Sequence, residues 1–181
     1  MNRIFAVIGM CGSGKSEVVK FFVEKGFKKV YFGDVVINEL KNRNLEINEN
    51  NEKTVREDLR NKFGMGVTAL KSLETIKQYV NSGFDVVIES LYSWDEFKII
   101  QNEFGSIFKL VNVYTTKKLR YERLSKRKIR PLTAEEAVSR DISEIENLDK
   151  GGPIAFADYQ IINDSGIENT KKQVEVIIEK N

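Results

Sequence analysis

Short apolar runs alternate with longer segments of helical periodicity along the chain. Five runs have the length of β-strands: Arg3–Ile8, Lys29–Phe32, Asp85–Glu89, Ile107–Tyr114 and Tyr159–Ile162. Runs such as Phe5–Ile8 and Val86–Ile88 are continuously apolar, which is typical of strands buried on both faces, and we expect this of all five. The alternation of strand and helix predicts βα units around a parallel sheet, and therefore an α/β fold.

Eight segments carry apolar residues at helical spacing. They are Lys15–Lys25, Val35–Lys41, Glu52–Lys62, Val67–Val80, Trp94–Phe104, Leu119–Lys128, Ala134–Leu148 and Glu168–Glu179. Thr133 and Glu136 fit a capping box, and Pro131 separates the helices on either side of it. The longest irregular pieces, Asn42–Asn51 and Lys150–Ala157, are expected to be mobile loops.

The composition limits the kinds of catalysis and metal binding that the chain can perform. The 181 residues fit one domain, 1–181, and the sequence contains no histidine and a single cysteine, Cys11. The usual zinc, haem and iron–sulfur ligand sets and histidine-based nucleophilic catalysis are therefore excluded. The net charge of +2 is too near balance for a dedicated nucleic-acid binder. No apolar run has the length of a membrane span or a secretory signal, so we expect a cytoplasmic protein without a membrane partner.

The strongest motif lies between the first strand and the first helix. Gly9–Ser16 fits G-x-x-x-x-G-K-[ST], in which glycines let backbone N–H groups converge on phosphate oxygens. In this motif Lys15 reaches the β- and γ-phosphates and the Ser16 hydroxyl ligates Mg²⁺. Cys11 contributes its backbone N–H, and a redox role for its thiol is not favoured. The N-K-x-D motif of GTPases is absent, and the chain is too short for the sensor domain of the AAA class.

Two acidic residues end predicted strands at the edge where open α/β sheets bind ligands. Asp34 follows the second strand, where it orients or deprotonates an acceptor, holds a metal-bound water, or simply caps a helix. Glu89 ends the third strand, the position of the carboxylate that organises the Mg²⁺ shell in P-loop enzymes, or it caps the next helix.

Arginines gather in one part of the chain. Arg120, Arg123, Arg127 and Arg130 are spaced by three, four and three residues, which places them on one face of the predicted helix. An acidic helix follows, so the pair suits a lid that closes over polyphosphate. A solvated face paired with its acidic neighbour and a short nucleic-acid patch are the alternatives.

Two further arginines, Arg56 and Arg60, lie four residues apart on the segment between the second and third strands. They share a helical face, either to hold a phosphate carried by the acceptor or to form pairs within the helix.

Taken together, several motifs resemble the nucleoside-monophosphate kinase group of P-loop kinases. The resemblance is carried by Gly9–Ser16, Gly33-Asp34, Val87–Glu89, Arg120-x-x-Arg123-x-x-x-Arg127 and Ala157–Ser165. It is closest to the adenylate-kinase-related proteins, with dephospho-coenzyme A kinases next. It implies a three-layer fold with five parallel strands in the order 2-3-1-4-5 and helices on both faces. It also implies an acceptor-binding insertion around residues 38–80 and a helical lid around residues 116–150.

The same resemblance implies roles for individual residues. Arg123 and Arg127 are lid arginines on the transferring phosphate, with Arg140 as a further one, and Asn163 and Asp164 lie beside the ATP base.

The chain departs from the family pattern after the third strand. It has Glu89–Tyr92 where these kinases often carry Asp-Gly-x-x-Arg, and it lacks the Pro-Leu-Leu of dephospho-coenzyme A kinases. Tyr92 and Trp94 either stack on a base or pack as core or surface residues.

The sequence thus predicts an ATP- and Mg²⁺-dependent kinase that phosphorylates a small nucleotide, with a nucleoside monophosphate as the favoured acceptor, as a monomer or homodimer. The alternatives are a hydroxyl kinase of the dephospho-coenzyme A type, with Asp34 as base, and a regulatory P-loop NTPase with a protein or RNA partner. We assign catalysis to Lys15, Asp34, Arg123 and Arg127, and Mg²⁺ to Ser16 and Glu89. We assign the nucleotide to Gly9, Met10, Cys11, Gly12, Ser13, Gly14, Lys15, Ser16, Val18, Arg120, Asn163 and Asp164. We assign the acceptor to Asp34, Arg56, Arg60, Glu89, Tyr92 and Arg140.

Overall fold

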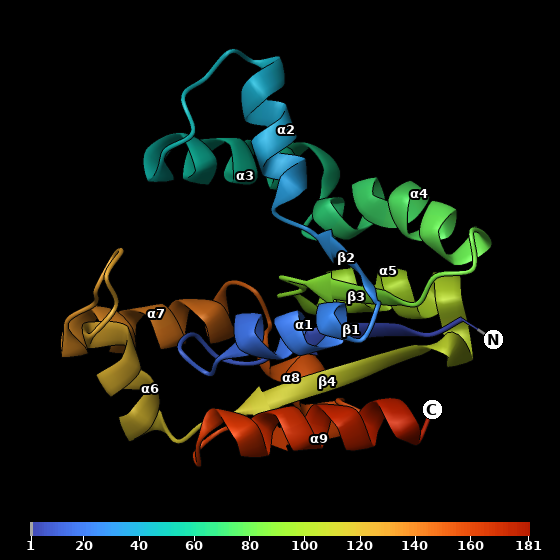
Figure 1. Cartoon of the computed structure of the whole chain (residues 1–181). Coiled ribbons are helices and arrows are strands. Elements are labelled where there is room, and N and C mark those ends of the chain that lie inside the picture. The colour runs from blue at the N-terminus through green and yellow to red at the C-terminus, as the bar shows by residue number, and fades with distance from the viewer. Residues whose placement is uncertain (1) are drawn as a thin grey trace.

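Five parallel strands form one sheet in the computed structural model, which describes residues 2–181 (Figure 1). The strands are β1 (Ile4–Ile8), β2 (Lys28–Tyr31), β3 (Val86–Glu89), β4 (Phe108–Tyr114) and β5 (Tyr159–Ile162). Their order is β2-β3-β1-β4-β5, and every pairing is parallel. The predicted strands and their predicted order are confirmed, with bounds that differ by at most one residue.

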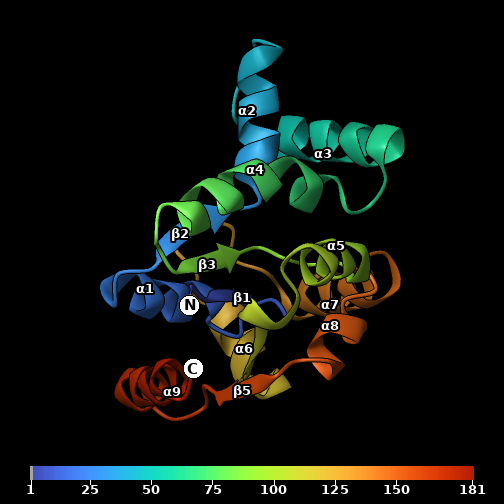
Figure 2. The same cartoon turned by 90° about the vertical axis from the view of Figure 1, so that its right-hand side faces the viewer.

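Helices cover both faces of the sheet (Figure 2). On one face lie α1 (Lys15–Glu24) and α9 (Ile167–Glu179), and on the other lie α4 (Val67–Asn81) and α5 (Trp94–Phe104), with the short α8 (Gly151–Ala155) against α5. Alternate residues of β1 enter the two cores: Phe5 and Val7 pack toward α1, and Ile4, Ala6 and Ile8 pack toward α4 and α5. Burial on both sides explains the continuous apolar run of β1.

The expectation that all five strands are buried on both faces is wrong for the two edge strands. In β2 only Val30 is fully buried, and in β5 only Ile161 is. Each edge strand has one neighbour, and Lys29, Tyr31 and Ile162 reach solvent there. Short edge strands with polar positions protect a sheet against pairing with other chains.

Two helical excursions rise from the sheet. The first, the α2–α3 arm, is residues 34–63 with α2 (Asp34–Asn42) and α3 (Glu49–Phe63). Its small core contains Val36, Leu40, Val55 and Leu59, which pack with Val67 at the start of α4. The second, the α6–α7 hairpin, is residues 117–146 with α6 (Lys117–Ser125) and α7 (Ala134–Glu146). Figure 1 shows the arm standing above β2 and the hairpin at the end of the sheet that carries the β1–α1 loop.

Some element bounds differ from prediction. Helix α6 ends at Ser125 rather than Lys128. Helix α3 begins at Glu49, inside the predicted loop, because the Asn48 side chain accepts a hydrogen bond from the N–H of Asn51 and caps it. Helix α8 lies in the other predicted loop, and a 3-10 turn spans Gly105–Ile107. The Thr133–Glu136 capping box is confirmed. In residues 2–181 no helix is both long and apolar enough to cross a membrane.

Candidate active site

The β1–α1 loop has the backbone of a phosphate cradle. Gly9, Gly12 and Gly14 have φ of 146°, 82° and 93°, values that favour glycine. A Cβ at Gly14 would overlap the side-chain nitrogen of Asn163, so the loop also needs glycine for close approach. Helix α1 begins at Lys15, and its free N–H groups therefore point toward the loop, where they suit an anion.

Lys15 is folded back into this loop. Its Nζ donates to the carbonyl oxygens of Gly9 at 2.8 Å and Met10 at 3.0 Å. Burial, followed by the positive charge of Lys150, lowers the pKa of Lys15 to about 7. An anion that enters the loop would therefore stabilise the charged form of Lys15.

Ser16 and Glu89 meet at the mouth of the loop, although 73 residues separate them. The Ser16 hydroxyl donates to Glu89 Oε1 at 2.9 Å, and Lys29 Nζ donates to Glu89 Oε2 at 3.1 Å. They meet because the carboxyl ends of β1 and β3 are neighbours, with Val7 paired to Glu89. A hydroxyl and a carboxylate are hard oxygen donors of the kind that Mg²⁺ prefers when phosphates complete its shell.

The back of the loop is held by the ends of β4 and β5. The carbonyl of Ser13 accepts from Asn163 Nδ2 at 2.8 Å and lies 3.0 Å from the Thr115 hydroxyl. Arg123 donates to Thr115 Oγ1 at 3.2 Å and to the Asn163 carbonyl at 2.8 Å. Asn163 and Arg123 therefore position the loop from behind. No motif in the sequence indicates Thr115, because its contribution depends on strands that are adjacent only in the folded sheet.

Two assigned nucleotide residues have other surroundings. Val18, predicted to belong to the nucleotide site, is completely buried in the core with Phe5 and Phe22. Its position in the helical repeat of α1 places the Val18 side chain on the face that packs against the sheet. Asp164 is exposed and accepts from the N–H of Thr116 at 2.9 Å, which ties the start of α6 to the end of β5.

The arginine stripe is divided. Arg120 is 6% exposed; its guanidinium forms two hydrogen bonds with Asp141 of α7, at 2.6 and 2.8 Å, and one with the Cys11 carbonyl. Of the three interpretations of these arginines, pairing with the acidic helix fits Arg120. The Arg120–Asp141 ion pair is, however, buried and not exposed to solvent. The prediction that four arginines share a helical face is wrong, since α6 ends at Ser125 before Arg127 and Arg130.

Beyond α6 the arginines border a cavity. Arg127 is exposed at its rim, Arg130 forms an ion pair with Glu49 of α3, and Arg140 donates to Glu144 at 3.2 Å. The Arg130–Glu49 pair joins the α6–α7 hairpin to the α2–α3 arm across the cavity.

This cavity, which we call the main cavity, has a volume of about 690 Å³ and extends from Cys11 of the phosphate loop to Arg56 and Arg60 of α3. The arm and the hairpin form its walls. Its other charged and hydroxyl side chains include Tyr31, Glu49, Glu52, Thr68, Ser90, Tyr92, Glu96, Arg127, Arg130, Glu136, Ser139, Arg140 and Ser143. A polar cavity of this size beside a phosphate loop suits a small, charged second molecule.

The predicted acceptor residues separate into two groups. Arg56 and Arg60 line the main cavity, and Arg60 Nε is buried without a hydrogen-bond partner in the described chain. Burial lowers the pKa of Arg60, so an anion in the cavity would stabilise its charge. Asp34 is exposed as the first residue of α2 and is not part of the cavity wall, and Gly33 rather than Asp34 is the N-cap.

The two aromatic candidates behave differently. Trp94 stacks on Phe97 with ring centres 4.9 Å apart and packs against the core, as the packing alternative predicts. Tyr92 lines the main cavity; its hydroxyl lies 2.9 Å from that of Ser90, and burial raises its pKa to about 12. Ser90 has a φ of 71°, which turns the chain after β3 and points this pair into the cavity.

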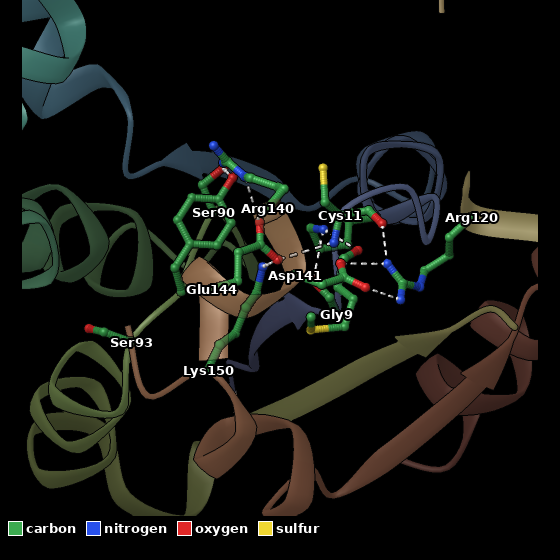
Figure 3. Close-up of polar contacts among 12 residues, drawn as sticks. Gly9, Cys11, Ser90, Ser93, Arg120, Arg140, Asp141, Glu144 and Lys150 are labelled. Carbon is green, nitrogen blue, oxygen red and sulfur yellow. Dashed lines mark hydrogen bonds and ion pairs between the residues drawn. The ribbon is translucent and has the colours of Figure 1, made fainter. Parts of the chain in front are cut away.

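Sequence reasoning missed a buried acid and a buried base beside the loop. Glu144 of α7 accepts from the backbone N–H of Cys11 at 3.2 Å and from Lys150 Nζ at 2.7 Å. Figure 3 shows Arg140 and Lys150 converging on Glu144, which faces Cys11. The only sign in the sequence was the acidic character of the segment after the arginine stripe.

Comparison with known proteins places this geometry in a family. A family model described as an AAA domain matches residues 6–148, which here form the P-loop kinase-like core from β1 through α7. The UPF0200 protein of Thermococcus onnurineus (strain NA1) is 35% identical over 180 residues, which cover 98% of this chain and 97% of the relative.

Solved structures share the fold. The dephospho-CoA kinase from Campylobacter jejuni has a TM-score of 0.57 at 18% identity, covering 99% of this chain and 97% of that one. The shikimate kinase from Bacteroides thetaiotaomicron has a TM-score of 0.61 at 14% identity, covering 98% of each chain. At these identities the likeness is one of fold.

Proposed function

Because the chain belongs to the UPF0200 family and residues 6–148 match an AAA domain, a P-loop nucleotide-binding core, we propose that it is an ATP-dependent small-molecule kinase whose acceptor is a nucleoside monophosphate. The observation that carries this proposal is the main cavity, which joins the phosphate loop to the guanidinium groups of Arg56 and Arg60. One end suits the donor phosphates, and the other suits an anionic group on the acceptor.

Phosphoryl transfer to a phosphate agrees with the residues present. An acceptor phosphate oxygen forms a bond to the γ-phosphorus, the bond to the bridging oxygen of ATP breaks, and ADP leaves with that electron pair. The acceptor phosphate is already ionised near neutral pH, so no base has to remove a proton. A chain without histidine can therefore perform this chemistry by positioning and positive charge.

The chain's own groups then have distinct roles. The loop N–H groups and Lys15 bind the donor phosphates, and Arg127 at the cavity rim offsets charge on the transferring group. Arg56 and Arg60 orient the acceptor. Ser16 and Glu89 fit Mg²⁺, which when bound neutralises charge on the donor phosphates.

A screen of acceptors tests the proposal. Purified protein with Mg·ATP is mixed with nucleoside monophosphates, deoxynucleoside monophosphates, dephospho-CoA or shikimate, and ADP release is followed. We expect a monophosphate to raise ADP release at least about tenfold, since binding both reactants removes most of the entropic barrier. Stimulation by the hydroxyl acceptors alone would favour the hydroxyl kinase, and no stimulation by any acceptor would favour the regulatory NTPase.

Matched variants test the roles proposed for the two ends of the main cavity. Lys15→Ala is expected to lower turnover by about 10³-fold, or about 4 kcal/mol, with the fold retained. Arg60→Gln is expected to lower kcat/KM for the acceptor by roughly 10- to 100-fold, because it removes a charge-assisted hydrogen bond. Lys62→Gln, on the same helix but outside the cavity wall, is the control. Equal kinetics for Arg60→Gln and Lys62→Gln would remove α3 from acceptor binding.

A further inference from the structure

Lys150 is the most completely buried charged side chain beside the phosphate loop. Its side chain is 0% exposed, its Nζ is 2.7 Å from Glu144 Oε2, and it lies over the ring of Tyr92 at 4.6 Å. A lysine is rarely buried without a strong reason, because removing an ammonium from water costs several kcal/mol per ion. Glu144 offsets that cost in this conformation, and its side chain is only 5% exposed.

The location of this pair points to phosphate chemistry. Glu144 Oε2 also accepts from the backbone N–H of Cys11, one of the loop groups suited to a phosphate oxygen (Figure 3). Lys15 Nζ donates to the carbonyl oxygens of Gly9 and Met10, the two residues before Cys11, so Lys15 and the Lys150–Glu144 pair contact the same loop. The carboxylate therefore lies where an anionic ligand of the loop belongs.

The charges around this point do not balance. Lys150 and Arg140 both donate to a single carboxylate, that of Glu144, and Lys15 lies in the loop beside it. Burial acts against ionisation of Glu144, but the charge and hydrogen bond of Lys150, together with the charges of Lys15 and Arg140, outweigh it and lower the pKa of the carboxyl. A group of oxygens with more negative charge than one carboxylate satisfies these cations better, and the end of a triphosphate is such a group.

We propose that Lys150 is a catalytic residue that binds the terminal phosphoryl group of the donor, and that Glu144 holds this position as an internal anion until a nucleoside triphosphate displaces it. Lys150 and Lys15 then contact that group together, and Arg140, released from Glu144, faces the acceptor through the main cavity whose wall it forms. This inference rests on the proposed function, because it assigns the terminal phosphate of that donor.

Three variants test it. Glu144→Gln removes the internal anion at nearly constant shape, Lys150→Met removes the cation, and the double variant removes both charges so that neither is left buried alone. Binding of ADP and of a non-hydrolysable ATP analogue, each with Mg²⁺, is measured by calorimetry, turnover is measured with the best acceptor, and thermal unfolding of each nucleotide-free variant checks the fold. Glu146→Gln and Lys172→Met, exposed on α7 and α9, are the charge-matched controls.

We expect Glu144→Gln to bind the triphosphate analogue on the order of 10-fold more tightly while its affinity for ADP stays within about twofold. We expect the double variant to fold like the native chain yet lose turnover by on the order of 10²-fold, because the cation on the transferring group is missing.

Each result separates this inference from the proposed function. If the native chain binds ATP and phosphorylates an acceptor while the double variant keeps native turnover, Lys150 and Glu144 are only a structural pair and the inference is overturned. Equal changes in ATP and ADP affinity for Glu144→Gln would also overturn it. If the native chain itself binds no ATP, the proposed function fails first.

Discussion

At the scale of residues, the buried charged groups beside the phosphate loop shift one another's pKa. Lys15 is buried and faces Lys150, and its pKa of about 7 follows from those two facts. Phosphate oxygens entering the loop would reverse the balance, because an opposite charge nearby favours the charged form of a lysine. The binding of nucleotide should therefore be linked to protonation of Lys15.

This linkage has a definite sign. At pH 8 the free protein holds Lys15 about nine-tenths neutral, whereas the complex holds it charged, so binding of ATP takes up about 0.9 proton. The affinity for ATP falls as the pH rises above about 7, by as much as roughly tenfold per pH unit, until the pKa of the bound state is reached. Calorimetry in buffers of different ionisation enthalpy measures the uptake. Lys15→Met should lose it and exposed Lys20→Met should keep it; native binding without proton uptake would refute the shifted pKa.

Arg120 and Arg127 are expected to differ in their contributions to stability and to turnover. Arg120→Ala leaves Asp141 buried without its partner, so we expect the free energy of unfolding to fall by about 3–5 kcal/mol. Arg127→Ala at the cavity rim should change it by no more than about 0.5 kcal/mol and lower turnover instead. Urea denaturation and steady-state kinetics of the two variants measure both effects. An Arg120→Ala protein that is stable but binds nucleotide weakly would instead support the prediction that Arg120 belongs to the nucleotide site.

Which residues the sequence could identify depends on how they are connected. Gly9–Ser16 act within one loop, so their spacing alone predicts the cradle. Glu89 was predicted because it ends β3 at the same edge of the parallel sheet as the loop that carries Ser16. Glu144 and Lys150 were not, because Glu144 meets Cys11 across 133 residues and only the packing of α7 on the loop brings them together.

At the scale of elements, the basic segment shows where periodicity fails. Helical spacing continues to Arg130, but α6 ends at Ser125, and the N–H of Leu132 returns to the carbonyl of Leu124. Arg130 has a φ of 54°, and with Pro131 it turns the chain toward α7. The turn, not the spacing, therefore sends Arg127 and Arg130 to the cavity. A pattern of side chains contains little information about such a turn.

The β5–α9 connection supports the phosphate loop, and this support can be measured. Asn163 donates to the Ser13 carbonyl and accepts from buried Thr170, so Asn163→Ala leaves buried polar groups unsatisfied. We expect the free energy of unfolding to fall by about 1–3 kcal/mol. Ser165→Ala, two residues away and exposed, is the control. Equal stability of the two variants would contradict a role for Asn163 in holding the loop.

At the scale of the whole molecule, the rigid sheet carries two helical excursions that face each other across the main cavity. The arm has its own small core, and the hairpin is linked to it by the exposed pair Arg130–Glu49. An exposed ion pair contributes at most about 1 kcal/mol, so it leaves the two walls free to move apart and together. Ligands that bind both walls should therefore bring them closer.

Hydrogen–deuterium exchange tests this closure. With Mg·ADP and a nucleoside monophosphate together, we expect slower exchange in the hairpin, residues 117–146, and in α3, because both contribute cationic side chains to the cavity. Either ligand alone should protect mainly the wall that it contacts, the hairpin for Mg·ADP and α3 for the monophosphate. Exchange in the second half of α9, residues 174–179, which packs on the far face of the sheet beyond the Asn163–Thr170 contact, should not change and serves as the internal control. Full protection of both walls by one ligand would contradict a closure that requires both, and a response confined to the phosphate loop would mean that the walls do not move.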